Sequence, residues 1–174
     1  MAGKTDSLDL STLQLSAGQA RQVDLLAEVE RLQFGGQTYS SDDTLVPVVL
    51  DVTRTKGGYS LRLRYDAQLG GPCMRCLEDA HAEMTIDARE IDQPRDEDED
   101  LRSPYIDGAE LDLRSWVRDS LALELPAQIV CREDCAGLCA TCGVNMNEAG
   151  PDHFHEREPD PRWAKLGELR LEEQ

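Results

Sequence analysis

The sequence predicts an α+β fold, with an antiparallel β-sheet, a helix and a cysteine-rich C-terminal segment. Three observations lead to this prediction. Between residues 23 and 91, apolar and polar residues alternate over several runs, as in strands that bury one face. Near residues 112–125 the apolar residues recur at helical spacing. The six cysteines of the 174-residue chain lie in closely spaced groups.

The chain is expected to form one domain with four successive parts, because 174 residues suit one compact domain better than two full ones. Residues 1–22 are interpreted as an N-terminal arm and residues 23–91 as the antiparallel sheet. Residues 92–111 form an acidic loop. Residues 112–174 carry the helix and then the Cys/His-rich segment.

Two adjacent runs give the clearest strands, 46–54 and 59–69. Their alternation places one set of side chains on a single face of the sheet: Val46, Val48, Leu50, Val52, Tyr59, Leu61, Leu63, Tyr65, Ala67 and Leu69. Lys56-Gly57-Gly58 between the runs predicts a tight hairpin in which the glycines supply positive φ angles.

Two further runs complete a sheet of about four strands. Residues 82–91 alternate through Ala82, Met84, Ile86 and Ala88. Residues 23–32 are interpreted as a strand, although their apolar residues also fit a helix face. The Gly-rich and polar residues that follow are interpreted as turn material.

The helix is expected to begin after Asp112, a good N-cap residue, and to end before Pro126. Its turns are marked by Leu113, Trp116, Val117, Ser120, Leu121 and Glu124. A second, short helix is expected around 160–171, where Trp163 and Leu166 have helical spacing.

The charge of the chain excludes some classes of function. Eighteen basic and 35 acidic residues give a net charge of −17, which argues against broad binding to phosphate backbones. No run approaches the ~20 apolar residues of a membrane-spanning helix, and the N-terminus lacks the apolar run of a secretory signal. We therefore expect a cytoplasmic protein, in which the cysteines bind metal or do redox chemistry instead of forming stable disulfides.

The cysteines and histidines predict a zinc-knuckle segment with one or two structural zinc ions. A CxxC turn directs two thiolates at one ion, and a tetrahedral zinc site needs four ligands. Two sets follow from the spacing. The first is Cys139, Cys142, His153 and His155, and the second is Cys73, Cys76, Cys131 and Cys135.

Other interpretations of these residues remain open. A redox dithiol would place its CxxC at a helix N-terminus, but Pro72 precedes Cys73 and no clear helix follows Cys76. The histidines lie in a polar stretch, which also fits ordinary surface residues, so one closed set and two closed sets both stay open. A closed site leaves no position for a catalytic water, and neither an HExxH motif nor a P-loop occurs, so we expect a protein that is not an enzyme. A metal-dependent RNA-processing enzyme and a redox or metal sensor are the alternatives.

Four segments resemble the YceD family of large ribosomal RNA subunit accumulation proteins. Residues 71–78 (GPCMRCLE) and residues 111–126 resemble two of the family's motifs. Residues 131–147 resemble its CxxxCxGLCxxCGxxLN motif, and residues 160–166 (DPRWAKL) its DPRWAxL ending. Many relatives carry a further Cys after the Asn-rich turn, where this chain has His153 and His155. The resemblance implies that these histidines take over the ligand role, or that Cys139 and Cys142 close with Cys131 and Cys135.

The resemblance also implies a role in large-subunit ribosomal RNA accumulation. The expected partner is a large ribosomal subunit precursor, reached through a ribosomal protein or through rRNA, with no membrane and no small-molecule substrate. Direct RNA contact would use local cations, of which the candidates are Arg54, Lys56, Arg62, Arg64 and Arg75. These cations also fit a merely solvated strand face. The acidic segment 92–112 is either a solvated loop or a docking surface for a basic ribosomal protein.

Overall fold

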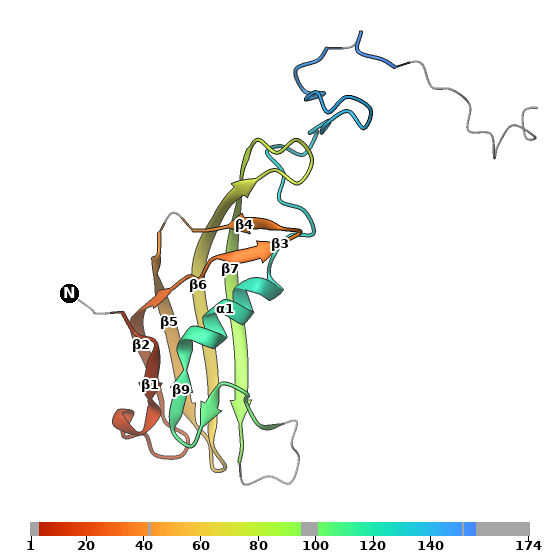
Figure 1. Cartoon of the computed structure of the whole chain (residues 1–174). Helices are drawn as coiled ribbons and strands as arrows, with labels where there is room; N and C mark the ends of the chain where they lie inside the picture. The colour runs from red at the N-terminus through yellow and green to blue at the C-terminus, as the bar shows by residue number, and fades with distance from the viewer. Residues whose placement is uncertain (1–3, 42, 95–100, 151, 156–174) are drawn as a thin grey trace, which may run out of the picture.

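A four-stranded antiparallel sheet forms the centre of the computed structural model (Figure 1). The structure describes residues 4–41, 43–94, 101–150 and 152–155. The sheet contains β2 (Ala20–Glu28), β5 (Leu45–Arg54), β6 (Tyr59–Pro72) and β7 (Asp79–Asp92), in that order. The predicted antiparallel sheet of about four strands is confirmed.

Alternation along the central strands determines which face is buried. All the residues predicted for the inner face of β5 and β6 are buried, from Val46 to Leu69. In β7, Met84 and Ile86 join them in the same hydrophobic cluster. Burying one such side chain contributes about 1.5–3 kcal/mol, so this face supplies most of the stability of the sheet.

The β6–β7 hairpin is longer than the sequence pattern suggests. Its pairing runs from Tyr59 opposite Asp92 to Pro72 opposite Asp79. The strand therefore continues through Gly70 and Gly71, where the apolar alternation has ended. This extension carries the tip of the β6–β7 hairpin beyond the rest of the sheet (Figure 1). Cys73 follows the last strand residue, Pro72, and belongs to a second, smaller hydrophobic cluster.

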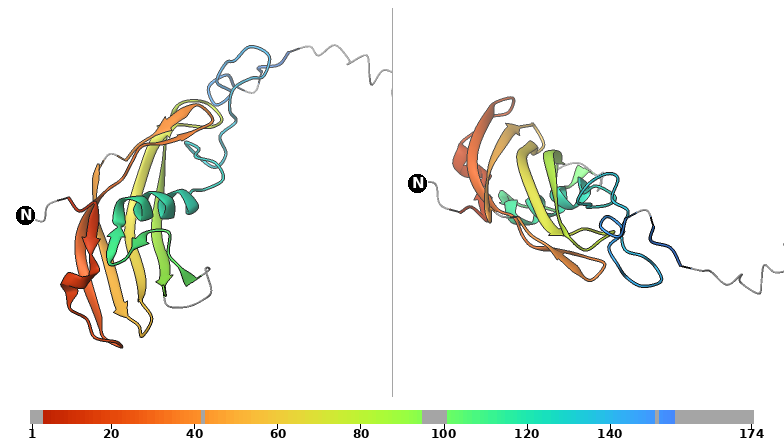
Figure 2. Two further views of the ribbon diagram at one scale, coloured as in Figure 1. Left: turned by 60° about the horizontal axis from the view of Figure 1, so that its bottom comes forward. Right: turned by 90° about the horizontal axis from the view of Figure 1, so that it is seen from above.

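Helix α1 (Leu113–Leu123) crosses one face of the sheet and contacts β2 and β7 (Figure 2). Asp112 caps it as predicted, accepting a hydrogen bond from the Ser115 backbone N–H at 3.0 Å. The Tyr65 hydroxyl donates to the Val117 carbonyl at 2.7 Å, and burial raises the pKa of Tyr65 to about 12. Within the described ranges, α1 is the sole α-helix, and no helix there is long and apolar enough to cross a bilayer.

Short strands supplement the main sheet at positions that the alternation does not mark. β1 (Ser7–Asp9) and β8 (Ile106–Asp107) flank β9 (Glu110–Asp112), and η1 (Leu10–Leu13) follows β1. β3 (Leu32–Phe34) and β4 (Gln37–Tyr39) form a hairpin. Gly35 and Gly36 turn this hairpin with φ angles of 56° and 80°, so the expected turn is present but lies between two strands.

Two predictions fall outside the described residues. The helix expected around 160–171 lies entirely outside the described ranges. Residues 95–100, the most acidic part of the predicted loop, also lie outside them. The described flank of that loop contains β8 and most of β9.

The turn between β5 and β6 differs from the prediction, because neither Gly57 nor Gly58 has a positive φ angle. The Thr55 N–H donates to the Gly58 carbonyl at 3.0 Å, and the Gly58 N–H donates to Thr55 Oγ1 at 2.9 Å. Glycine is required at position 58 because a side chain has no room there. A Cβ atom on Gly58 would lie 1.8 Å from the Asp92 carbonyl oxygen.

We expect Gly58→Ala to destabilise the protein by about 1–3 kcal/mol, the usual cost of an overpacked site. Gly57→Ala is the matched control, because its Cβ would meet only the flexible Gln93 side chain at 3.4 Å. Urea unfolding of both variants measures the difference. Equal stabilities would mean that the backbone of Asp92 moves away without cost.

Candidate metal centres

The first cysteine pair lies in a tight turn at the tip of the β6–β7 hairpin. The Leu77 N–H donates to the Cys73 carbonyl at 3.0 Å, and Leu77 has a φ of 66°. The Cys73 N–H donates to the Glu78 carbonyl at 2.6 Å. The Arg75 N–H approaches Cys73 Sγ at 3.4 Å, as a donor to a thiolate does. The turn thus holds Cys73 and Cys76 on one side of the hairpin tip.

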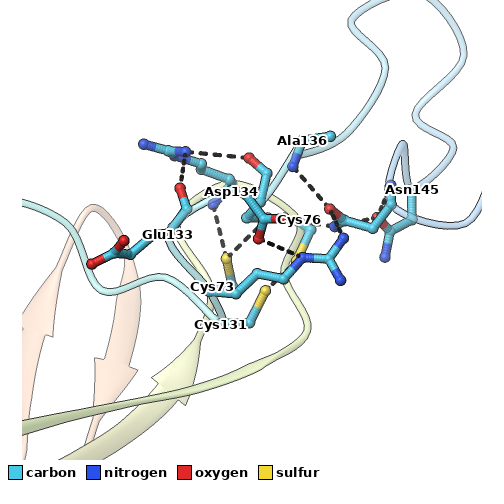
Figure 3. Close-up of polar contacts among 11 residues, drawn as sticks. Cys73, Cys76, Cys131, Glu133, Asp134, Ala136 and Asn145 are labelled. Carbon is cyan, nitrogen blue, oxygen red and sulfur yellow. Dashed lines mark hydrogen bonds and ion pairs between the residues drawn. The ribbon is translucent and has the colours of Figure 1, made fainter.

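The chain returns to this tip after α1 and brings a second cysteine pair to it. The Met74 N–H donates to the Ile129 carbonyl at 2.9 Å, which fixes the approach of the returning segment. Cys135 Sγ then lies 3.9 Å from Cys73 Sγ, and Cys131 Sγ lies 3.6 Å from Cys76 Sγ (Figure 3).

The four residues Cys73, Cys76, Cys131 and Cys135 are called the tetra-cysteine group below. Their Sγ atoms all lie within 4.8 Å of one another, so the group could hold a metal ion. Cys131 is exposed and the other three are buried. The structure therefore brings together the four residues that the spacing grouped.

The second predicted set, Cys139, Cys142, His153 and His155, is called the Cys/His group. A reverse turn positions its cysteines: the Gly143 N–H donates to the Cys139 carbonyl at 2.8 Å, with Gly143 at a φ of 74°. Cys142 Sγ lies 3.6 Å from His153 Nε2 and 3.2 Å from His155 Nε2. Ligand atoms of all four residues lie within 4.8 Å, so this group too could hold a metal ion.

Hydrogen bonds lower the pKa of some thiols in each group, whereas other thiols of the tetra-cysteine group have a raised pKa. The hydrogen bond to His153, and then the Cys142 backbone N–H, lower the pKa of Cys139 to about 5. Burial alone would raise the pKa of Cys73, but the backbone N–H donors of Cys76 and Arg75 outweigh it and lower that pKa to about 6. Burial and then the neighbouring thiols raise the pKa of Cys131 to about 12. Four adjacent thiolates need a cation, and a bound divalent ion would deprotonate the thiols that otherwise retain protons.

Arg75 supports the tetra-cysteine group. This role of Arg75 was not predicted from the sequence. Its Nε and Nη2 atoms donate to Gln128 Oε1 at 3.1 and 3.0 Å. Its Nη1 atom donates to the carbonyls of Cys135 and Glu133 at 3.2 and 3.3 Å. The guanidinium therefore fastens the returning segment to the hairpin tip. Its position inside the CxxC was the one sequence signal for this role.

Asn147 also supports the tetra-cysteine group, and this role was not predicted from the sequence. Its Nδ2 atom donates to Cys135 Sγ at 3.4 Å. Its Oδ1 atom accepts from the Ala136 N–H and from Arg132, both at 2.8 Å. Asn147 follows the Cys139–Cys142 turn in the chain yet contacts a ligand candidate of the other group. Only its place after the cysteine block could have indicated this.

The other candidate RNA-binding cations lie along the β5–β6 hairpin, and three of them have intramolecular partners. Arg62 binds Asp87 through two hydrogen bonds of 2.7 and 2.6 Å, and Arg64 binds Asp51 at 2.8 Å. Arg54 lies 4.3 Å from the centre of the Tyr59 ring. Lys56 is exposed in the turn. This arrangement favours the interpretation of these residues as a solvated strand face.

Comparison with known proteins identifies relatives in bacteria and plants. An uncharacterised protein of Mycobacterium tuberculosis is 40% identical over 105 residues, covering 57% of this chain and 49% of its own length. A similar protein of Mycobacterium leprae is 34% identical over 103 residues, covering 56% and 46%. The large ribosomal RNA subunit accumulation protein YCED homolog 1, chloroplastic, of Zea mays is 32% identical over 181 residues, covering 79% and 59%.

The chain spans about half the length of the mycobacterial relatives. No solved structure matches it. The sequence profile of the family described as large ribosomal RNA subunit accumulation protein YceD matches residues 61–170, which include both candidate metal groups. Because this match covers more than half of the sequence, the chain belongs to the YceD family.

Proposed function

We propose that the protein is a non-enzymatic factor that supports biogenesis of the large ribosomal subunit and accumulation of its rRNA. Membership of the YceD family carries this proposal. The name of the maize relative agrees with it. The partner would be a precursor of the large subunit, contacted through a ribosomal protein or through rRNA.

The two candidate metal groups support a structural role for zinc. A tetrahedral site with Zn–S bonds of about 2.3 Å has sulfur atoms about 3.8 Å apart. Two of the sulfur separations in the tetra-cysteine group, 3.6 and 3.9 Å, are close to this value, and all of its sulfur atoms lie within 4.8 Å of one another. Each group offers four candidate ligand atoms, which is the number that fills a tetrahedral zinc site and leaves no position for water. We therefore assign two structural zinc ions per chain.

Asn147→Ala tests the assignment at the tetra-cysteine group. Residues that hydrogen-bond to metal ligands typically change metal affinity by about 10- to 100-fold when they are removed. Asn147 donates to Cys135 Sγ and orders the Ala136 backbone, so we expect its loss to raise the rate of zinc release from this group about tenfold or more. Competition with a chromophoric chelator measures the rate. Glu148→Ala, at the exposed neighbouring position, is the control.

A sucrose-gradient profile of cells depleted of this protein tests the proposed function. Fewer large subunits, with the tagged protein on large-subunit precursors in undepleted cells, is the expected result. A normal profile, with the protein only at the top of the gradient, would refute the proposal. Complementation with the full chain controls for effects on neighbouring genes.

A further inference from the structure

The main sheet splits at one end, between β5 and β6. The two strands pair only from Val49 opposite Arg64 to Arg54 opposite Tyr59. Beyond these pairs β5 stays with β2, and β6 stays with β7. The strands diverge towards the end of the sheet that carries the β3–β4 hairpin (Figure 1). At the far side of the split, Ser40 and Gly70 exchange two backbone hydrogen bonds of 3.0 and 2.8 Å.

The backbone of β6 presents free pairing groups to this split. In a strand, every second residue directs its N–H and C=O to the same edge. Since Gly70 bonds to Ser40 at this edge, Gln68 and Asp66 direct their backbone groups into the split as well. Both residues are exposed. If the β5–β6 register continued, Pro47 would lie opposite Asp66. Proline has no N–H and is tolerated where a strand has no neighbour on that side.

A cleft of about 600 Å³ lies at the split. Its wall includes three carboxylates, Asp43, Asp66 and Glu83, together with Pro47 and Gln68. Among the described residues that line it, none is a lysine or an arginine. The nearest cation in β6, Arg64, is bound to Asp51. The cleft is therefore negative at its wall and offers strand-pairing groups at its edge.

We propose that this cleft binds an extended segment of a basic partner protein. The segment adds as a strand to the free edge of β6, and its lysine or arginine side chains lie beside the three carboxylates. Main-chain bonds to a strand edge supply affinity in such complexes, and side-chain contacts supply selectivity. RNA fits poorly, because the carboxylates repel its phosphates. This inference rests on the proposed function, for which it specifies how a ribosomal protein is contacted.

Residue-resolved amide exchange of the full-length, zinc-loaded chain tests strand addition. The probe is a short synthetic peptide of alternating lysine and valine. Exchange is expected to slow at Asp66 and Gln68, whose N–H groups face the split. Ala67, whose N–H faces β7, should not change. Unaltered exchange at Asp66 and Gln68 under saturating peptide would overturn the proposal.

Replacing the three carboxylates of the cleft wall by amides tests how much their charge contributes to peptide binding. The triple variant Asp43→Asn, Asp66→Asn and Glu83→Gln should bind the peptide about tenfold more weakly. A control triple, Asp107→Asn, Glu110→Gln and Glu124→Gln, removes the same charge at exposed positions outside the cleft and should bind as the unaltered chain does. Equal affinities of the two triples would contradict the proposal. So would tight binding of a glutamate–valine peptide or of an oligouridylate in place of the lysine peptide.

Complementation of depleted cells separates this inference from the proposed function. If the cleft triple fails to restore large subunits while the control triple restores them, the cleft is the docking site. If both triples restore them fully, the docking proposal fails and the proposed function stands. A normal profile in depleted cells without any complementation would refute the function itself, whatever the peptide does.

Discussion

Cys73→Ser is expected to remove one zinc ion per chain and to unfold the returning segment around Cys131 and Cys135. Within residues 127–150, the described chain forms no helix or strand, only an isolated bridge between Leu138 and Asn145. Its buried hydrophobic residues, Ile129 and Cys135, belong to a small cluster in which cysteines are half of the members. Ordering each residue costs about 1–2 kcal/mol of backbone entropy, and so small a cluster cannot offset that cost without metal.

The size of this effect follows from the energy of zinc sites. Structural zinc contributes on the order of 10–16 kcal/mol of coupled folding energy in small domains. A serine cannot replace a thiolate of the tetrahedron, so most of that energy is lost. Metal content by mass spectrometry and limited proteolysis of the segment measure the outcome. The far-ultraviolet circular dichroism of the sheet should change little, because the main hydrophobic cluster contains none of the cysteines.

Cys139→Ser is the matched variant in the other group. It should also lose one ion, but residues 127–135 should remain resistant to protease, since the tetra-cysteine group is intact. If Cys73→Ser retained two ions per chain and the unaltered proteolysis pattern, the tetra-cysteine group would not be a structural zinc site. If neither Cys73→Ser nor Cys139→Ser changed the metal content, both zinc assignments would be refuted.

The main sheet could be predicted because its strands bury one face. Val46 to Val52 and Tyr59 to Leu69 alternate over enough residues to fix both strand and face. The short strands could not be predicted in this way. β1 pairs Ser7 with Asp112, more than one hundred positions away in the chain, and three-residue strands carry too little pattern. The β3–β4 hairpin was hidden by its two glycines, which indicate a turn without showing that strands flank it.

Close spacing brings the members of each cysteine pair together, and the structure places the predicted residues in two groups that could hold metal ions. What spacing cannot show is how the pairs are fastened to the fold. Arg75 and Asn147 act through carbonyls, amides and one thiol that are far away in sequence. The candidate cations Arg62 and Arg64 show the reverse case, because their carboxylate partners lie on neighbouring strands and become visible only in the register.

Trp116→Ala is expected to give the largest loss of stability in the sheet and helix. Trp116 is 2% exposed and lies on the face of α1 that is packed on the sheet. Its ring stacks on Tyr105, with ring centres 6.1 Å apart and planes at 22°. Replacing such a residue by alanine costs about 3–5 kcal/mol, because apolar contacts are lost and a cavity remains.

Leu123→Ala on the same helix is the control, because Leu123 is 85% exposed. Its replacement should change the free energy of unfolding by less than about 0.5 kcal/mol. Urea unfolding followed by circular dichroism measures both variants in the zinc-loaded state. If Trp116→Ala cost no more than Leu123→Ala, α1 would not be held on the sheet by its apolar face. The hydrogen bond from Tyr65 to the Val117 carbonyl would then have to hold the helix, and Tyr65→Phe would become the more damaging change.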